Sequence, residues 1–267
     1  MQNNYPPRFT YQEFARDFTA ELFDPHKWMA LFEKSGAKYV ILTAKHLDGY
    51  TLWPSNYSFS WNSKDVGPDR DLLGEFTNAV RNTSMKFGLY YTLFEWYHPQ
   101  YMSDKKSKFT KNDFVLHKVL PEMMEMVNLY QPDILWSGGD WQANDTYWKS
   151  KEFLAWLYNE SPVKDTVLVN DGWGNGTECR HGGYFVCSNL SAIKNHKWEK
   201  AVKMDKLSWG YRRNVNYEDF QTVKELILIL AQTVSRGGNL LLNVGPTSDG
   251  RIDLLSSPTR KMVICKW

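Results

Sequence analysis

Side chains that bind sugars or transfer protons follow the apolar segments of this sequence at several points. Aromatic rings stack on the flat faces of sugars, while carboxylates and imidazoles bind hydroxyl groups or exchange protons. The candidate residues are His46, Tyr90, Tyr91, Trp136, Asp140, Trp198 and Glu199. Because functional residues gather at the C-terminal ends of parallel strands, we expect this set to converge as a carbohydrate pocket.

Each of these residues also has an ordinary structural explanation. A tryptophan at a strand end more often packs than contacts a ligand, and a single histidine is more often only hydrogen-bonded. Aromatic residues make up 15% of the chain, which suits both sugar binding and a large aromatic core. The prediction of a pocket therefore depends on the whole set of residues.

Short apolar segments rich in β-forming residues alternate with amphipathic segments. We predict strands at 38–45, 86–93, 132–137, 166–170 and 238–245, weaker strands at 184–187 and 206–210, and helices at 71–81, 114–130, 153–158 and 218–235. This alternation predicts an α/β fold with a parallel sheet covered by helices. A (β/α) barrel fits better than an open sheet, because no Gly-X-Gly-X-X-Gly motif follows a strand.

The composition excludes several classes of protein. The 267 residues have a formal charge of +2, which excludes a strongly basic nucleic-acid-binding protein. No apolar segment approaches the roughly 20 residues of a membrane-spanning helix, so we expect no membrane association. No two histidines have metal-ligand spacing, and the CxxC and HExxH motifs are absent, so we expect no metal site.

Cysteines and glycosylation triplets bear on the cellular compartment. Cys179 and Cys187 are close enough in sequence to pair, leaving Cys265 over, but three buried thiols are an equal alternative. Six Asn-X-Ser/Thr triplets favour the secretory route, beginning at Asn56, Asn82, Asn144, Asn159, Asn175 and Asn189. The first residues lack the basic start and apolar stretch of a signal peptide. We therefore expect that this chain lacks its natural N-terminus.

Eight motifs together carry a specific family resemblance. They lie at 45–49, 61–68, 88–96, 135–137, 181–184, 196–199, 208–213 and 237–246. On these motifs the chain resembles the α-L-fucosidase family of retaining glycoside hydrolases, and within it the animal lysosomal and secreted enzymes. The resemblance implies a (β/α)-barrel-like catalytic domain followed by a small β-sandwich, and removal of terminal α-L-fucose from glycoproteins and glycolipids without a cofactor. It also implies a fucosylated glycan as partner, and it allows a homo-oligomer.

The chain departs from the family pattern at four positions. Gly138 takes the place of the nucleophilic Asp, Gly172 that of an active-site Arg, and Leu47 that of a second sugar-binding His. Asn189 replaces one candidate acid/base, so Glu199 is the remaining candidate for that role. Because glycine has no side chain to attack the anomeric carbon, the comparison implies impaired catalysis and an empty space at Gly138.

Asp140 is the nearby carboxylate available as a substitute nucleophile. It lies beyond Gly138 and Gly139, which we expect to end the strand, so a supporting role is favoured over attack on the sugar. The residues expected to bind substrate are His46, Tyr90, Tyr91, Trp136 and Trp198.

The domain expectation follows from the same resemblance. Residues 1–252 correspond to a barrel domain without the family's first strand, and 253–267 form a divergent tail where the β-sandwich would begin. We expect an α-L-fucosidase-like hydrolase with impaired catalysis. The hypotheses weighed are an active fucosidase that uses Asp140 as its nucleophile, a catalytically dead glycan-binding relative that acts like a lectin, and a non-functional fragment.

Overall fold

The computed structural model describes residues 5–186 and 196–252. Cys187, Asn189, Cys265 and the tail at 253–267 lie outside the described residues, and so do the expectations attached to them.

The strands form two parallel sheets. The first has the order β1 (Tyr39–Lys45), β2 (Lys86–Thr92), β3 (Ile134–Gly138) and β4 (Leu168–Val169). The second pairs β5 (Trp198–Lys203) with β6 (Gly238–Asn243). In the first sheet Tyr90 lies opposite Trp136, which sets two of the predicted site residues side by side.

A short segment connects the two sheets. The amides of Gly183 and Tyr184 both donate to the carbonyl of Val169 in β4, and Phe185 forms a parallel bridge with Trp198 in β5. The described strands therefore follow one another as a partial parallel α/β sheet, in agreement with the predicted fold class.

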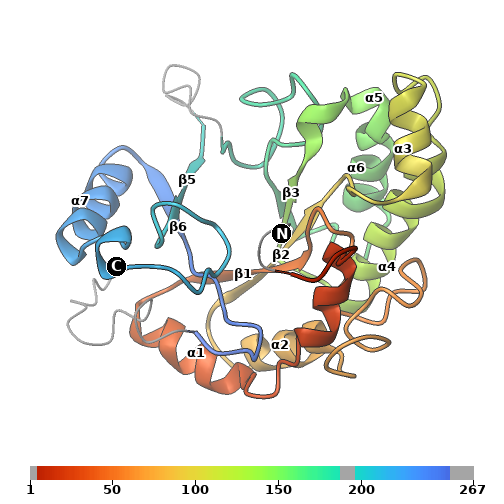
Figure 1. Ribbon diagram of the computed structural model, residues 1–267. Helices are drawn as coiled ribbons and strands as arrows, with labels where there is room; N and C mark the ends of the chain where they lie inside the picture. Colours follow the sequence, from red (N-terminus) through yellow and green to blue (C-terminus); the bar gives the residue numbers. More distant parts are fainter. Residues whose placement is uncertain (1–4, 187–195, 253–267) are drawn as a thin grey trace.

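Helices lie outside the strands on three sides (Figure 1). They are α1 (Pro25–Lys34), α2 (Leu72–Arg81), α3 (Pro99–Lys106), α4 (Leu120–Tyr130), α5 (Asp145–Trp148), α6 (Ser150–Asn159) and α7 (Val223–Val234). Short 3₁₀ helices lie at η1 (Tyr11–Asp17), η3 (Asp140–Gln142) and η4 (Tyr217–Asp219), and a π turn, η2 (Val115–Val119), precedes α4.

Local caps explain where the helices begin. Asp71 accepts a hydrogen bond from the amide of Gly74, which places the start of α2 as the sequence predicts. The helix predicted at 218–235 starts later, because Thr222 and Glu225 form a reciprocal capping box at the first turn of α7.

The strand β5 differs from the sequence-based expectation, which puts Trp198 and Glu199 after a strand and a weak strand at 206–210. In the structure Trp198 begins β5, and residues 206–210 form a loop. The charged residues Glu199, Lys200 and Lys203 interrupt any apolar pattern, so only pairing with β6 identifies this segment as a strand.

The two halves of the sheet differ in burial. One large apolar cluster joins β1, β2 and β3 to α2, α4 and α6, with Leu89, Met123, Leu135 and Phe153 almost completely inaccessible. Complete burial of one such side chain stabilises the fold by about 1.5–3 kcal/mol. β6 is only partly buried, and Leu228 of α7 is 54% exposed.

Among the described residues, no helix is long and apolar enough to cross a membrane.

Candidate active site

A cavity of about 1440 Å³ lies at the C-terminal ends of β1, β2 and β3 and extends along β1 and β6. Five of the predicted site residues line it: His46, Tyr90, Trp136, Gly138 and Asp140. Leu47 and Gly172, two of the family substitutions, line it as well. Tyr91, Trp198 and Glu199 are not among the described lining residues, so the structure brings together only part of the predicted set.

Three ring systems form a row along one wall of the cavity. The His46 and Tyr90 rings are stacked at 5.9 Å between centroids, and the Tyr90 and Trp136 rings lie at 4.9 Å. Burial lowers the pKa of His46, which favours the neutral imidazole. A neutral imidazole beside two aromatic faces can accept or donate a hydrogen bond to a sugar hydroxyl.

The space at Gly138 is not empty, which corrects the expectation of a carboxymethyl-sized void. A Cβ atom added at Gly138 would overlap the Tyr90 hydroxyl and lie 2.8 Å from Cε2 and 2.9 Å from Cζ. The Tyr90 hydroxyl also accepts a hydrogen bond from Oγ1 of Thr92 at 3.2 Å. Because glycine leaves no side chain there, the phenol ring of the neighbouring strand fills the position.

Asp140 lies just beyond the end of β3, in the turn η3. Gly139 before it has a φ of 72°, a left-handed conformation that turns the chain out of the strand. The Asp140 carboxylate accepts a hydrogen bond from the amide of Gly174 at 3.1 Å, and burial raises its pKa. This carboxylate therefore fixes the following loop while one side of the residue lines the cavity.

The loop after β4 closes over the end of β3. The Asn170 side chain accepts from the amide of Ser137 at 2.9 Å and donates to its carbonyl at 2.8 Å. A Cβ atom at Gly172 would lie 3.1 Å from both the Asn170 amide nitrogen and the Ser137 carbonyl. An arginine at this position would need a small shift of its neighbours.

Tyr91 lies on the opposite face of β2 from Tyr90, because successive strand residues point to opposite faces. Its hydroxyl donates to Glu122 of α4 at 2.8 Å, and its side chain is inaccessible to solvent. The expectation that both tyrosines line the pocket thus differs from the structure, which assigns Tyr91 to the helix-covered side.

A buried ionic cluster surrounds Tyr91 on this outer face. Lys45 lies 2.7 Å from Glu95, and Lys118 lies 2.7 Å from Glu122. Burial lowers the pKa of Lys45. Burial acts to raise the pKa of Glu122, but the two lysines outweigh it and lower this pKa overall. The cluster holds the start of the His46 loop against α4.

Glu199 is the second residue of β5 and is 3% exposed. Its carboxylate accepts a hydrogen bond at 2.5 Å from the hydroxyl of Tyr39, the first residue of β1. Burial raises its pKa to about 7. Tyr39 lines the cavity, so Glu199 adjoins the cavity through this tyrosine and not at a C-terminal strand end.

Trp198 packs within the sheet. Its ring lies against Gly238 of β6 and Phe185, and its indole N–H donates to the carbonyl of Arg236 at 3.2 Å. Because the indole N–H has this backbone partner, the Trp198 ring stabilises the junction between β5 and β6 in this structure.

Two residues beside the cavity, Tyr39 and Asp171, are outside the predicted set of site residues. Tyr39 carries no motif, and only its contact with Glu199, 160 positions away, reveals it. Asp171 is almost completely buried and accepts hydrogen bonds from the amides of Cys179 and Val186, at 2.8 and 2.9 Å. Cys179 is disulfide-bonded. The Asn-Asp pair at 170–171, directly after a predicted strand, is the signal that identifies this loop anchor.

The part of the chain that the structure describes contains no group of three or more His, Cys, Asp or Glu side chains arranged to hold a metal ion.

Comparisons with known proteins agree on one family. The α-L-fucosidase family model matches residues 1–264. An α-L-fucosidase of Branchiostoma floridae is 55% identical over 256 residues, which cover 94% of this chain and 57% of that protein. Tissue α-L-fucosidase of Homo sapiens is 50% identical over 270 residues, which cover 100% of this chain and 58% of that protein. The chain thus spans less than two thirds of the length of these relatives.

A solved structure shares the fold. It is a Thermotoga maritima α-L-fucosynthase, an aspartate-to-glycine variant in complex with α-L-Fuc-(1-2)-β-L-Fuc-N3. Its TM-score is 0.80 at 36% identity, and the match covers 95% of this chain and 57% of that chain.

Proposed function

This chain belongs to the α-L-fucosidase family, and from that premise we propose that it is an α-L-fucosidase-type glycoside hydrolase with impaired catalysis. The proposed substrate is terminal α-L-fucose on glycoproteins or glycolipids, bound in the cavity at the C-terminal ends of β1, β2 and β3. Retaining hydrolysis needs a nucleophile for the anomeric carbon and an acid for the leaving oxygen.

The observation that carries the proposal is the arrangement at Gly138. The wall of the cavity keeps His46, Tyr90 and Trp136, which suits recognition of a sugar, but the family's nucleophile position has no carboxylate. The Tyr90 phenol fills that position, and burial raises its pKa, which disfavours the phenolate needed for attack. Binding is thus retained while the covalent step is lost.

The surroundings of Asp140 also argue against a substitute nucleophile. Its carboxylate is engaged by the Gly174 amide, and it lies in a turn after the strand has ended. Attack geometry tolerates an error of only about 1 Å, so we assign Asp140 to positioning the loop.

Glu199 is the proposed acid/base. A pKa of about 7 leaves a large protonated fraction at neutral pH, as a general acid requires. Its carboxylate is bonded to Tyr39 and lies beside the Trp136 indole, and both of these side chains line the cavity.

A second candidate function is glycan binding without hydrolysis. The stacked row of His46, Tyr90 and Trp136 favours it, because these contacts need no nucleophile. The Thermotoga maritima protein is itself an aspartate-to-glycine variant and holds a fucosyl sugar.

The remaining expectations are part of the same proposal. We propose a barrel-like domain at 1–252, a tail of divergent sequence at 253–267, and a lysosomal or secreted location, which the six glycosylation triplets support. A fucosylated glycan is the proposed partner, and no cofactor takes part.

The test is release of nitrophenol from an aryl α-L-fucoside. Relative to the human tissue enzyme, we expect turnover at least ~10⁴-fold lower, the usual cost of losing one member of a catalytic unit. Asp140→Asn keeps an acceptor for the Gly174 amide and should leave this residual rate unchanged, as should the control Asp165→Asn at an exposed carboxylate. Substantial turnover that Asp140→Asn alone abolishes would make Asp140 the nucleophile and refute the proposal.

A second part of the test restores a carboxylate at position 138. Gly138→Asp alone should restore little, because the new side chain meets the Tyr90 ring. A Gly138→Asp/Tyr90→Ala double variant makes room for it and should raise turnover above that of either single variant.

A further inference from the structure

The proposed acid Glu199 is a buried carboxyl group whose neighbours are neutral. Burial raises its pKa, while the Tyr39 hydroxyl and the Trp136 indole lower it. In the described part of the chain, no charged residue is among the groups that shift this pKa. Two neutral donors, one from β1 and one from β3, therefore decide how easily the buried group loses its proton.

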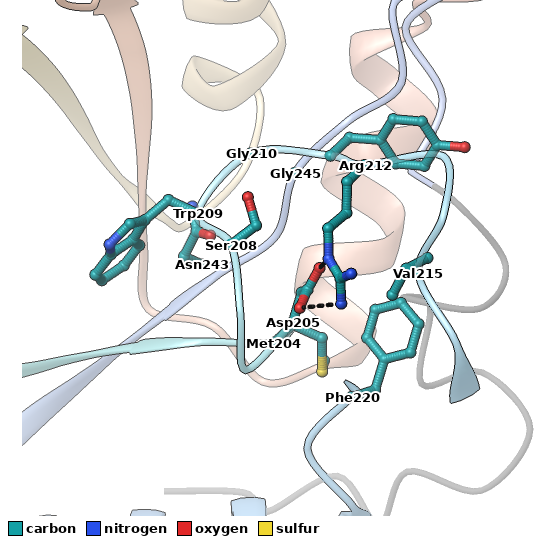
Figure 2. A pocket seen from close by; sticks show the side chains of 11 residues that line it. Met204, Asp205, Ser208, Trp209, Gly210, Arg212, Val215, Phe220, Asn243 and Gly245 are labelled. Carbon is teal, nitrogen blue, oxygen red and sulfur yellow. Dashed lines mark hydrogen bonds and ion pairs between the residues drawn. The ribbon is translucent and has the colours of Figure 1, made fainter. Parts of the chain in front are cut away.

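The strand that carries Glu199 is fixed at both ends. At its start, the indole N–H of Trp198 donates to the carbonyl of Arg236 at 3.2 Å. Just beyond its end, the Asp205 carboxylate pairs with Arg212 through hydrogen bonds of 2.6 and 3.1 Å, as Figure 2 shows. Every residue of β5 is also paired with β6. The backbone at Glu199 is thus held in place, and only the direction of its side chain remains to be set.

Tyr39 supplies the contact that directs this side chain. It is the first residue of β1, in the other sheet, and its hydroxyl donates to Oε2 of Glu199 at 2.5 Å. The half-buried Tyr39 lines the cavity, whereas Glu199 is not among the described lining residues. Because Oε2 accepts this hydrogen bond, the proton of the neutral acid belongs on the other oxygen, Oε1.

The carboxyl group adjoins the aromatic wall of the site at Trp136. The Trp136 indole lies beside it, and the same indole lies 4.9 Å from the Tyr90 ring between centroids. An acid in this place is one side chain away from the row of rings at which the sugar is proposed to bind. Rotation of the Glu199 side chain would move its acidic oxygen by more than the roughly 1 Å that reacting groups tolerate.

From these contacts we propose that Tyr39 is a positioning residue for acid/base catalysis by Glu199. Its hydroxyl holds Oε2 and leaves Oε1 to carry the proton. The electron pair of the glycosidic bond goes to the leaving oxygen, which takes the proton from Oε1. The water that bonds to the anomeric carbon then returns a proton to the carboxylate. This role rests on the proposed function, since it assumes that Glu199 acts on a fucoside.

The first test follows the titration of Glu199 by carbon NMR of the intact chain, labelled at the glutamate carboxyl carbons. Glu199→Gln identifies the signal, and its midpoint in the unmodified chain should lie at about pH 7. Tyr39→Phe keeps the ring but takes a donor from the ionised form. The midpoint should therefore rise by roughly 1–2 pH units, the shift that matches one hydrogen bond to a charged group.

Tyr184→Phe is the matched control. Tyr184 is buried, and its pKa is raised by burial and then by the charge of Glu199, so it belongs to the same surroundings. Its hydroxyl forms no hydrogen bond to Glu199 among the described residues. Loss of this hydroxyl should move the midpoint by less than about 0.5 pH units.

The second test connects the contact to proton transfer. It compares residual turnover of a phenyl α-L-fucoside, whose leaving oxygen needs a proton, with that of a dinitrophenyl α-L-fucoside, whose leaving oxygen does not. Tyr39→Phe should slow the phenyl fucoside roughly tenfold and the dinitrophenyl fucoside less than twofold. The fall in the phenyl rate at alkaline pH should move upwards by the same interval as the NMR midpoint.

The outcomes distinguish the positioning role from the proposed function. An unchanged midpoint in Tyr39→Phe, or an equal shift in Tyr184→Phe, would overturn the proposal. Equal slowing of both fucosides would also overturn it, because a merely structural loss does not depend on the leaving group. If the unmodified chain turns over neither fucoside, the proposed function fails, and the catalytic role of Tyr39 fails with it.

Discussion

The two faces of the first sheet differ in what their polar side chains contact. On the outer face, Tyr91, Lys45 and Glu122 belong to a buried cluster in which each charged group has a partner. On the inner face, Tyr90 and Trp136 line the cavity, and the Trp136 indole lies beside the Glu199 carboxylate of β5. The difference indicates that the outer face stabilises the fold, while the inner face forms the wall of a cavity that can hold a ligand.

Tyr90 and Tyr91 show the contrast within one dipeptide. Tyr91 is held by Glu122, whereas Tyr90 stacks on His46 and fills the position beside Gly138. Their roles differ only because the strand turns alternate residues to opposite sides. Substitutions on each face can therefore test whether the outer face controls stability and the inner face controls sugar recognition.

The largest expected effect is on the outer face. Glu122→Gln removes one of the two carboxylates that Lys118 and Lys45 share and leaves only Glu95 for both, so we expect a loss of about 3–5 kcal/mol in the free energy of unfolding. Urea denaturation would measure it. Asp69→Asn, in an exposed pair with Lys64, is the control and should cost less than about 1 kcal/mol. Equal losses in the two variants would show that the outer cluster is not a special source of stability.

The next effect is a pH dependence on the inner face. The folded pKa of Glu199 is about 7, against an ordinary value of 4.5, so the folded protein holds this proton more tightly than the unfolded chain. The contribution of Glu199 to stability is then fully present below pH 4.5, falls as the pH rises to 7, and is lost above that, a change of about 3 kcal/mol.

Glu199→Gln should remove this component, since glutamine does not titrate. Urea midpoints at pH 5 and pH 7.5 would show a smaller difference for the variant than for the unmodified chain. An unchanged difference would mean that Glu199 titrates near its ordinary value and is not suited to act as an acid at neutral pH.

Hydroxyl removal compares the two tyrosines directly. Tyr91→Phe takes a hydrogen bond from a buried carboxylate and should cost roughly 1.5–3 kcal/mol. Tyr90→Phe loses only the contact with Thr92 and should cost less than about 1 kcal/mol. Fucose affinity should respond in the reverse order, and a larger affinity loss in Tyr91→Phe would contradict the assignment of the faces.

The smallest effect concerns packing at Gly138. Gly138→Ala places a methyl group against the Tyr90 ring and should cost about 1–2 kcal/mol through overpacking. In a Tyr90→Ala background the same substitution should cost much less, because the obstructing ring is gone. A double-mutant cycle measures the difference, and an additive result would show that the two residues do not compete for the same space.

Local patterns predicted the elements that form the large apolar cluster. β1 and β2 are largely apolar segments of strand length, and Asp71 caps α2 where the sequence places it. The strand β5 escaped prediction, because Glu199, Lys200 and Lys203 break the apolar pattern and only pairing with β6 reveals it. Successive residues of a strand point to opposite faces, so the positions of Tyr90 and Tyr91 in β2 already indicate that only one of them can face the pocket. The expectation that both bind substrate overlooked this alternation.

The sequence alone determined the family, the α/β class, the absence of a carboxylate at Gly138, and the set of residues from which a sugar pocket could be built. These depend on residue identity and on spacing along the chain. Only the tertiary structure decided that Tyr90 fills the space at Gly138, that Glu199 is bonded to Tyr39, and that Tyr39 and Trp136 line one cavity. Each of these results is a contact between segments far apart in sequence, and it depends on strand pairing and on which face of the sheet each side chain occupies.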